Sequence, residues 1–179
     1  MNLYFSTIVA ALLLVSCGEQ PEKLNVMEEL DRTTKDGVEI DYTPRVTGIG
    51  GIFFISDDPK ASKEWYAQNL GLKVNEWGSS FESRNANRPD EINYLQWSPY
   101  KTGSEYLDPS KKEFMINYRV HDLDGLLVKL KANGVTILDE VATYDYGKFV
   151  HIMDNEGNKI ELWEPIDSVF TAMGGETTK

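Results

Sequence analysis

Residues 154–165 have the sequence DNEGNKIELWEP, a polar turn followed directly by a strand pattern. The turn, residues 154–158, is rich in Asp, Asn and Gly, which tight hairpin turns favour. Polar and apolar residues then alternate over 159–162, as they do in a half-buried strand. A second strand pattern over 148–153 precedes the turn. The stretch therefore predicts a β-hairpin that ends at Trp163-Glu164-Pro165.

The residues before this hairpin predict one strand, one helix and a further short strand. Residues 114–120 alternate apolar and polar side chains. Asp122 is the expected N-cap of a helix whose leucines follow the i, i+3, i+4, i+7 rule, and Asn133-Gly134 ends that helix. A short strand is expected over 136–138. The second half of the chain thus has the order β-α-β-β-β.

The first half of the chain repeats that order. Residues 49–55 form a β-type apolar run, and Asp58-Pro59 supplies an N-cap with proline at the first helical position. Gly71 ends the helix, and Trp97-Ser98-Pro99 corresponds to the Trp163-Glu164-Pro165 ending of the second half. We interpret the two halves as a tandem duplication. The three further strands are expected over 73–77, 79–83 and 92–98.

The stretches that characterise the two halves are GIGGIFF at 48–54, Asp58-Pro59, Trp65-Tyr66, Leu70-Gly71-Leu72 and residues 154–165. In combination they resemble the vicinal oxygen chelate superfamily, which includes glyoxalase I, bleomycin-resistance proteins and extradiol dioxygenases. The resemblance covers about residues 46–167 and implies an α+β fold of paired βαβββ modules, over about 46–100 and 112–167. It implies curved mixed sheets around a ligand cavity, which family members complete within one chain or by dimerisation.

Catalytic members of that family hold a divalent metal with four side chains, two from each module. Carried over to this sequence, the four positions are Gly51, Leu95, Met115 and Glu161. Only Glu161 offers a ligand to a hard or borderline cation. We therefore expect no cofactor, and a divalent metal only if ligands outside the family set are used.

One polar pair stands out in the last hairpin. Symmetric closure of the turn places His151 directly across from Glu161, with Cβ atoms ~4.5–5.5 Å apart. The pair is a candidate acid–base dyad in which Glu161 orients His151 and raises its pKa. The alternatives are two ligands for a metal, or a structural hydrogen bond on a half-buried sheet. The chain's other histidine, His121, is expected to be a solvated capping residue.

Strand parity predicts the two faces of the sheet. The cavity face is expected to be largely aromatic with a few convergent polar groups, as small-molecule sites require. The alternative is that these side chains fill the space and leave no cavity. The face packed under the helices is expected to carry Ile52, Phe54, Ile116, Tyr118, Val150, Ile152, Ile160 and Leu162. The cavity face is expected to carry Phe53, Asn93, Leu95, Trp97, Met115, Asn117, Arg119, Phe149, His151, Glu161 and Trp163.

The N-terminus has the pattern of a secretion signal. Residues 1–16 contain no charged side chain, and residues 8–15 form an unbroken apolar run. The run ends in Leu14-Val15-Ser16-Cys17-Gly18, which resembles the lipobox of bacterial lipoproteins. That resemblance implies cleavage before Cys17, lipid attachment to its thiol and anchoring of the protein in the cell envelope.

Composition sets further limits. The chain has 29 acidic and 18 basic residues and a net charge of −11, which argues against a nucleic-acid partner. One cysteine excludes an intrachain disulfide, and 41% hydrophobic residues suffice for a core. Residues 17–45 are expected to form an acidic tether behind the lipidated cysteine, and residues 168–179 a flexible tail.

The sequence therefore predicts a lipid-anchored protein that resembles glyoxalases and binds a small apolar or aromatic molecule without the family's metal. One alternative is a metal-dependent lyase, isomerase or dioxygenase of the glyoxalase type, in which His151 and Glu161 use further ligands from a second copy of the chain. Another is a non-catalytic envelope interaction module with a filled cavity. The expected partners are the small molecule and the membrane, with homodimerisation as a further option.

Overall fold

The computed structural model describes residues 34–35, 38–39, 43–86 and 88–178, which divide into two units, Met1–Glu39 and Ile40–Lys179. In the first unit, β1 (Thr34–Lys35) pairs antiparallel with β2 (Val38–Glu39), within the stretch expected to be a tether. The predicted signal peptide 1–16 and Cys17 lie outside the described residues. Within the described part of the chain, no helix is long and apolar enough to span a membrane.

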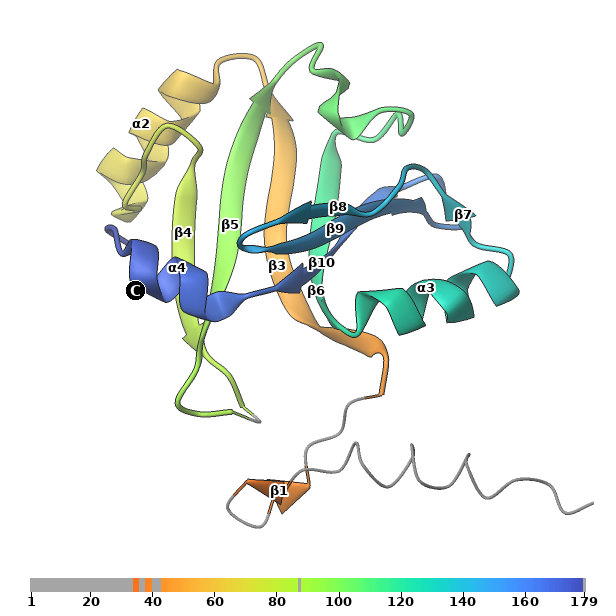
Figure 1. The fold of residues 1–179 in the computed structure, drawn as a ribbon. Coiled ribbons are helices and arrows are strands. Elements are labelled where there is room, and N and C mark those ends of the chain that lie inside the picture. Colours follow the sequence, from red (N-terminus) through yellow and green to blue (C-terminus); the bar gives the residue numbers. More distant parts are fainter. Residues whose placement is uncertain (1–33, 36–37, 40–42, 87, 179) are drawn as a thin grey trace, which may run out of the picture. The chain divides into compact units, whose positions relative to one another are not determined.

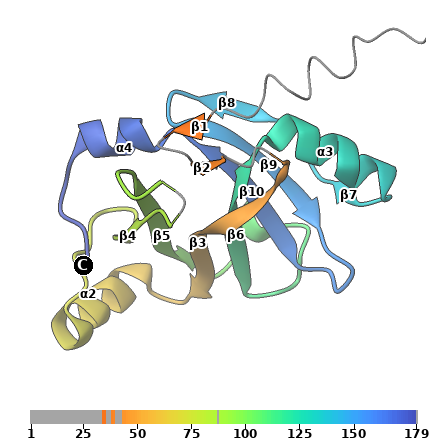
Figure 2. The same cartoon turned by 90° about the horizontal axis from the view of Figure 1, so that it is seen from below.

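The second unit is built on one mixed sheet of eight strands that curls around its own inner face (Figures 1 and 2). At its centre β3 runs antiparallel to β6. On one side β5 is parallel to β3 and β4 pairs with β5, and on the other β10 is parallel to β6 and β9 pairs with β10. The strands are β3 (Arg45–Ser56), β4 (Ser79–Arg84), β5 (Ile92–Lys101), β6 (Phe114–His121), β7 (Thr136–Ile137), β8 (Ala142–Tyr144), β9 (Gly147–Met153) and β10 (Lys159–Pro165).

The element order confirms the α+β fold of paired modules. The first module is β3, α2 (Pro59–Leu70), β4 and β5, and the second is β6, α3 (Leu123–Ala132), β7, β9 and β10. The strand expected over 73–77 is reduced to one bridge, between Val74 and Ser79. The reason is local, because Asn75 Oδ1 accepts the backbone N–H groups of Trp77 and Gly78 and closes a turn there.

The helices of the two modules are capped as their sequence predicts. Asp58 Oδ1 accepts the N–H groups of Lys60 and Ala61 at the start of α2, and Gly71 ends that helix at φ 73°. Asp122 Oδ1 accepts the N–H of Gly125 at the start of α3. These side chains and this glycine satisfy backbone groups that a helix end leaves without partners.

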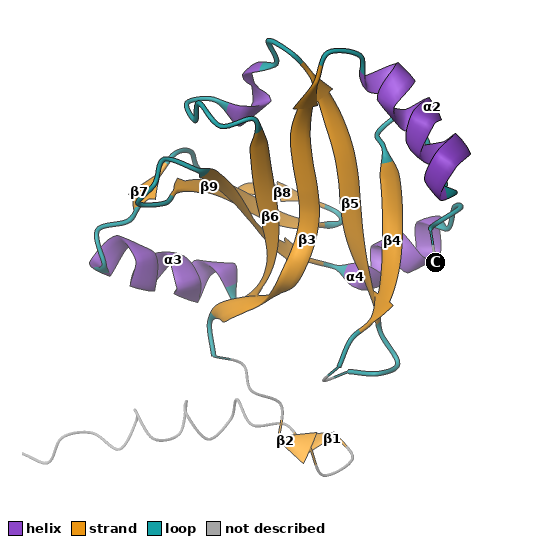
Figure 3. Ribbon diagram, turned by 180° about the vertical axis from the view of Figure 1, so that it is seen from behind, coloured by secondary structure: helices purple, strands orange, loops and turns teal. Residues whose placement is uncertain are grey.

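The main hydrophobic core lies under α3. Leu123, Leu126 and Leu127 pack there against Val150 and Leu162 of the sheet, as strand parity predicts. The prediction is wrong for Ile52, which is 40% exposed because neither helix covers that part of β3. In contrast, α2 buries none of its residues completely, and its Trp65 is 54% exposed. Seen from behind, the two helices lie to either side and leave the outer face of β3 and β6 uncovered between them (Figure 3). The second module therefore carries most of the core.

The end of the chain packs against the first module. A short helix, α4 (Asp167–Met173), follows β10, and Tyr94 of β5 donates its hydroxyl to Thr171 of this helix at 3.3 Å. Further on, the Thr178 N–H donates to the Ser80 carbonyl of β4 at 2.8 Å. These contacts lie within residues 168–179, for which the sequence predicts a flexible tail. They join residues far apart along the chain, which local patterns cannot reveal.

The central pairing of β3 with β6 depends on a glycine. The register shifts between Ile49 and Gly51, and Gly50 at this irregularity faces the inside of the curl. A Cβ atom on Gly50 would lie 2.3 Å from Asn117 Oδ1, 2.7 Å from the Trp163 ring and 2.9 Å from Arg119 Cγ. Side chains of β6 and β10 therefore occupy the space that any other residue at position 50 would need.

Gly50→Ala is expected to lower the free energy of unfolding by about 1–3 kcal/mol, since three packed side chains must move to admit the methyl group. Gly48→Ala is the matched control on the same strand, because its nearest neighbour would be Arg119 Cδ at 3.8 Å. Urea unfolding of both variants checks this. Equal stability of the two variants would contradict the close approach at Gly50.

Candidate functional site

The inner face of the curled sheet lines a half-open cavity of about 810 Å³. Its lining comes from both modules, from the connection between them and from α4. This volume lies within the range of known small-molecule sites, which are mostly apolar with a few placed polar groups. Its aromatic lining residues are Phe53, Trp77, Tyr94, Tyr100, Tyr106, Tyr144, Tyr146, Phe149, Trp163 and Phe170.

Four of these rings form a wall at the second module. The rings of Phe149 and Trp163 stack with centroids 5.6 Å apart, as neighbours across β9 and β10. Phe170 of α4 contacts the Trp163 ring edge-on at 5.4 Å, and Tyr146 contacts Phe170 at 5.6 Å. Because α4 contributes a ring to this wall, it closes one side of the cavity.

The Glu161 carboxylate is the most buried charge in the cavity lining, with its side chain 5% exposed. Three groups converge on it. The Tyr106 hydroxyl donates to Oε1 at 2.6 Å, the Asn117 amide donates to Oε2 at 2.5 Å, and His151 Nε2 lies 3.0 Å from Oε1. A buried carboxylate with three donors is held in one orientation.

His151 bridges two carboxylates. Besides Glu161 at Nε2, Asp139 Oδ2 lies 2.5 Å from Nδ1. Both ring nitrogens can donate only in the imidazolium form. Burial lowers the pKa of His151, but the hydrogen bonds to Glu161 and Asp139 outweigh it, so the pKa lies above its ordinary value. Burial raises the pKa of Glu161, yet the bonds from His151, Tyr106 and Asn117 outweigh it and hold the pKa below its usual value.

These shifts determine what the pair can do. A carboxylate with a lowered pKa is a weak base, whereas an imidazolium is a proton donor. The predicted pairing of His151 with Glu161 is present, and Asp139 adds a third member. Together, His151, Glu161 and Asp139 can bind a polar group of a ligand, or His151 can donate a proton to that group.

The four family metal positions do not fit a metal ion here. Gly51 has no side chain, and a Cβ there would lie 2.8 Å from the Phe53 ring, so a larger residue has no room. Met115 is fully buried against Phe53 and Leu107. In the described part of the chain, no three His, Cys, Asp or Glu side chains are grouped to hold a metal.

The structure brings most of the predicted site residues together. Glu161, His151, Phe53, Leu95, Asn117, Phe149 and Trp163 line the cavity, whereas Asn93, Trp97, Met115 and Arg119 do not. Trp97 lies on the outer face, where it packs against Phe54 and Tyr66 of α2. The prediction for β5 is wrong by one residue, because Ser98 is the β5 residue paired with Phe53. The cavity face of β5 therefore carries Tyr94, Gln96, Ser98 and Tyr100, and Trp97 points to the outer face.

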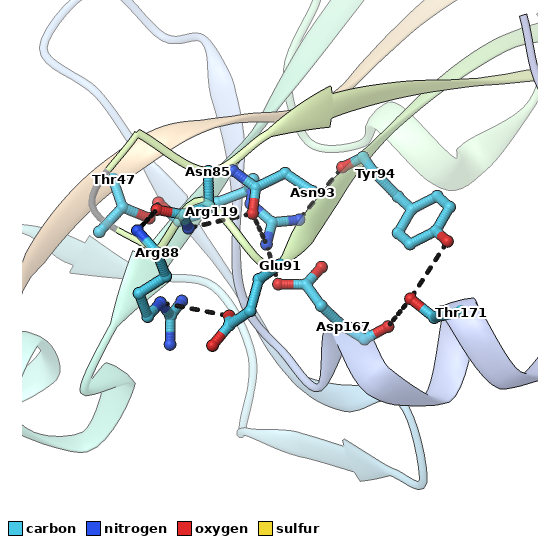
Figure 4. Close-up of polar contacts among 9 residues, drawn as sticks. All are labelled: Thr47, Asn85, Arg88, Glu91, Asn93, Tyr94, Arg119, Asp167 and Thr171. Carbon is cyan, nitrogen blue, oxygen red and sulfur yellow. Dashed lines mark hydrogen bonds and ion pairs between the residues drawn. The ribbon is translucent and has the colours of Figure 1, made fainter. Parts of the chain in front are cut away.

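Arg119 lies behind the cavity wall and holds α4 in place (Figure 4). Its guanidinium forms an ion pair with Asp167, donates to the Tyr94 carbonyl at 3.1 Å and to Asn93 Oδ1 at 3.2 Å. It also lies over the Trp163 ring, 5.1 Å from the centroid. Arg119 therefore neutralises Asp167 and connects the two modules to the C-terminal helix.

Two groups of the site have no counterpart in the sequence predictions. Tyr106 belongs to the short 3-10 helix Glu105–Leu107 between the modules, and its ring stacks on Tyr100 with centroids 4.6 Å apart. Asp139 lies in the connection after β7. Neither position belongs to a periodic pattern, so only the folded chain brings them to Glu161.

A family model and solved structures resemble this chain, and the match to the family model agrees with the fold. The family model described as Glyoxalase/Bleomycin resistance protein/Dioxygenase superfamily matches residues 48–162. Methylmalonyl-CoA epimerase of Mycobacterium tuberculosis is 23% identical, with 70% of this chain and 93% of that chain covered and a TM-score of 0.49. A variant of the Streptomyces coelicolor epimerase in complex with 2-nitronate-propionyl-CoA is 16% identical, with 68% and 99% covered and a TM-score of 0.52. No curated protein sequence matches.

His151→Gln is expected to lower the free energy of unfolding by about 1–3 kcal/mol at pH 6 and by less at pH 9. The pKa of His151 is raised on folding, so its contribution is complete below the ordinary value of 6.5 and is lost as the pH rises through the folded value. Urea unfolding at both pH values measures this. His121→Gln, which removes the chain's other histidine from outside the cavity, is the control, and an equal pH dependence in both variants would contradict the prediction.

Proposed function

This chain belongs to the Glyoxalase/Bleomycin resistance protein/Dioxygenase superfamily, and we propose that it is a lipid-anchored member that binds a small, largely apolar molecule without the family's metal. The observation that carries the proposal is the cavity of about 810 Å³ with its aromatic lining. Cavities of this size and composition bury most of a ligand's surface, and their few polar groups fix its orientation. Here those polar groups are Glu161 and the three side chains bonded to it, Tyr106, Asn117 and His151.

Binding without metal is supported by the residues at the family's metal positions. Three of the four lack a suitable donor, and the fourth, Glu161, already accepts hydrogen bonds from Tyr106 and Asn117. A metal at Glu161 would have to compete with these donors for the carboxylate oxygens. The proposal therefore includes no cofactor.

A second candidate function is acid–base catalysis without metal, favoured by the placement of His151 between Asp139 and Glu161 at the cavity. In that case His151 delivers a proton to a bound substrate, and Asp139 orients the ring. The lowered pKa of Glu161 makes it a weak base, so abstraction of a proton by this carboxylate is disfavoured. For this reason binding is the leading proposal.

The proposed location is the cell envelope, with a lipid on Cys17 as the membrane contact. The support is the uncharged start 1–16 and the stretch Leu14-Val15-Ser16-Cys17-Gly18. The net charge of −11 supports the absence of a nucleic-acid partner. A homodimer is compatible with the family. If no small molecule binds in the cavity, the proposed role is instead that of an interaction module without a ligand.

Ligand binding in the cavity is testable by a thermal-shift screen of small aromatic compounds on the full chain. A ligand at 100 times its Kd stabilises the fold by ~2.7 kcal/mol. The shift is expected to persist in EDTA and to be lost in Ala142→Phe, which places a ring inside the cavity. Thr143 lies on the same strand but does not line the cavity, so Thr143→Phe should retain the ligand-induced thermal shift. Loss in EDTA, or equal shifts in both variants, would contradict metal-free binding in this cavity.

Membrane anchoring is testable by fractionation of bacterial cells that express the full chain. The wild type is expected in the membrane fraction, and Cys17→Ala is expected in the soluble fraction because the thiol that accepts the lipid is gone. Ser16→Ala keeps a small residue before the cysteine and should remain anchored. Cys17→Ala found wholly in the membrane fraction would rule out lipidation at this residue.

A further inference from the structure

We infer that the ligand of the cavity is an organic cation, an ammonium group carried on an aromatic or apolar body. The inference rests on the proposed function, namely small-molecule binding in the cavity, and names the chemical class of the molecule. It depends on the charges and aromatic rings that line the cavity, and on two buried basic side chains that do not line it.

The charged lining is almost entirely acidic. The carboxylates of Glu76, Asp139, Glu140 and Glu161 line the cavity, and no Lys or Arg is present among its described lining residues. The one basic side chain there, His151, is already bonded to Asp139 and Glu161. An anionic ligand would meet four carboxylates with no free cation to pair with, whereas an ammonium group would be attracted.

Two buried basic side chains are not among the lining residues of the cavity. Arg119 is 3% exposed, does not line the cavity and is neutralised by Asp167. Lys159 is 8% exposed, donates to the Tyr106 carbonyl at 2.7 Å and lies 5.5 Å from the centroid of the Tyr106 ring. Both basic side chains are thus engaged by groups of the chain itself, and neither is among the lining residues of the cavity.

The rings of the cavity also favour a cation. The face of an aromatic ring attracts an ammonium group, and the attraction grows when water is excluded. Tyr144, which is 52% exposed, and Trp77, which is 72% exposed, line the cavity together with the exposed carboxylates Glu76 and Glu140. These accessible rings and carboxylates are the groups that an entering cation would meet.

A further observation agrees on the sign of the charge. Burial raises the pKa of Tyr100 and Tyr146, and the negative charge of Glu161 raises both further. A negative potential in the cavity suits a cationic ligand.

The test uses three compounds that share one ring system and differ in charge. These are 2-(1-naphthyl)ethylammonium, the neutral 2-(1-naphthyl)ethanol and the anion 3-(1-naphthyl)propanoate, titrated calorimetrically into the full chain. We expect the ammonium compound to bind about tenfold more tightly than the alcohol, which corresponds to about 1.4 kcal/mol, and the carboxylate to bind most weakly. Equal or tighter binding of the alcohol or the carboxylate would overturn the inference and leave small-molecule binding intact. Binding of none of the three would overturn both.

Paired variants assign the preference to the cavity. The double variant Glu76→Gln/Glu140→Gln removes two charges from the lining and is expected to weaken ammonium binding about tenfold while leaving the alcohol unchanged. The double variant Glu113→Gln/Glu156→Gln removes two exposed charges that do not line the cavity and should change binding less than about twofold, given screening by salt. An equal effect of the two variants would assign the preference to the overall charge of the chain and overturn the role of the cavity.

Discussion

The close approach of β3 to the side chains of β6 and β10 is the constraint on which the rest of the molecule depends. At Gly50, space for even one methyl group is taken by Asn117, Trp163 and Arg119. This contact lies where the register of β3 on β6 shifts, at the junction of the two modules. The two halves can therefore form one continuous curled sheet, and the inside of that curl is the cavity.

The same constraint accounts for the chemistry of the site. Beside Gly50, the position of a family metal ligand is held by Gly51, whose side-chain space is filled by Phe53 and Asn117. Asn117 in turn donates to Glu161, the one family position that keeps a ligand. A carboxylate that elsewhere in the family faces a metal thus has protein donors around it here. Glu161 is therefore the centre of a hydrogen-bonded polar group within an aromatic cavity.

Much of the fold could be predicted because its signals are local. The caps Asp58 and Asp122, the alternation in β6 and the turn before β10 each depend on a few neighbouring residues, and the structure confirms them. The pairing of His151 with Glu161 could also be predicted, since a symmetric hairpin fixes which residues face each other. Local sequence patterns do not predict the conformation of the connecting segments. Tyr106, Asp139 and Phe170 reach the cavity from segments without a periodic pattern, and the register of β5 depends on its pairing with β3.

The central claim is that a ligand enters the cavity between the two modules, and the four tryptophans of the chain report on it independently. Trp77 and Trp163 line the cavity, whereas Trp97 packs against α2 on the outer face and Trp65 lies on that helix. The most direct measurement is a ¹H–¹⁵N spectrum of the four indole groups during titration with 2-(1-naphthyl)ethylammonium. The account predicts that the signals of Trp77 and Trp163 shift with saturation while those of Trp65 and Trp97 stay in place. Shifts confined to Trp65 and Trp97, or no shift at all, would contradict it.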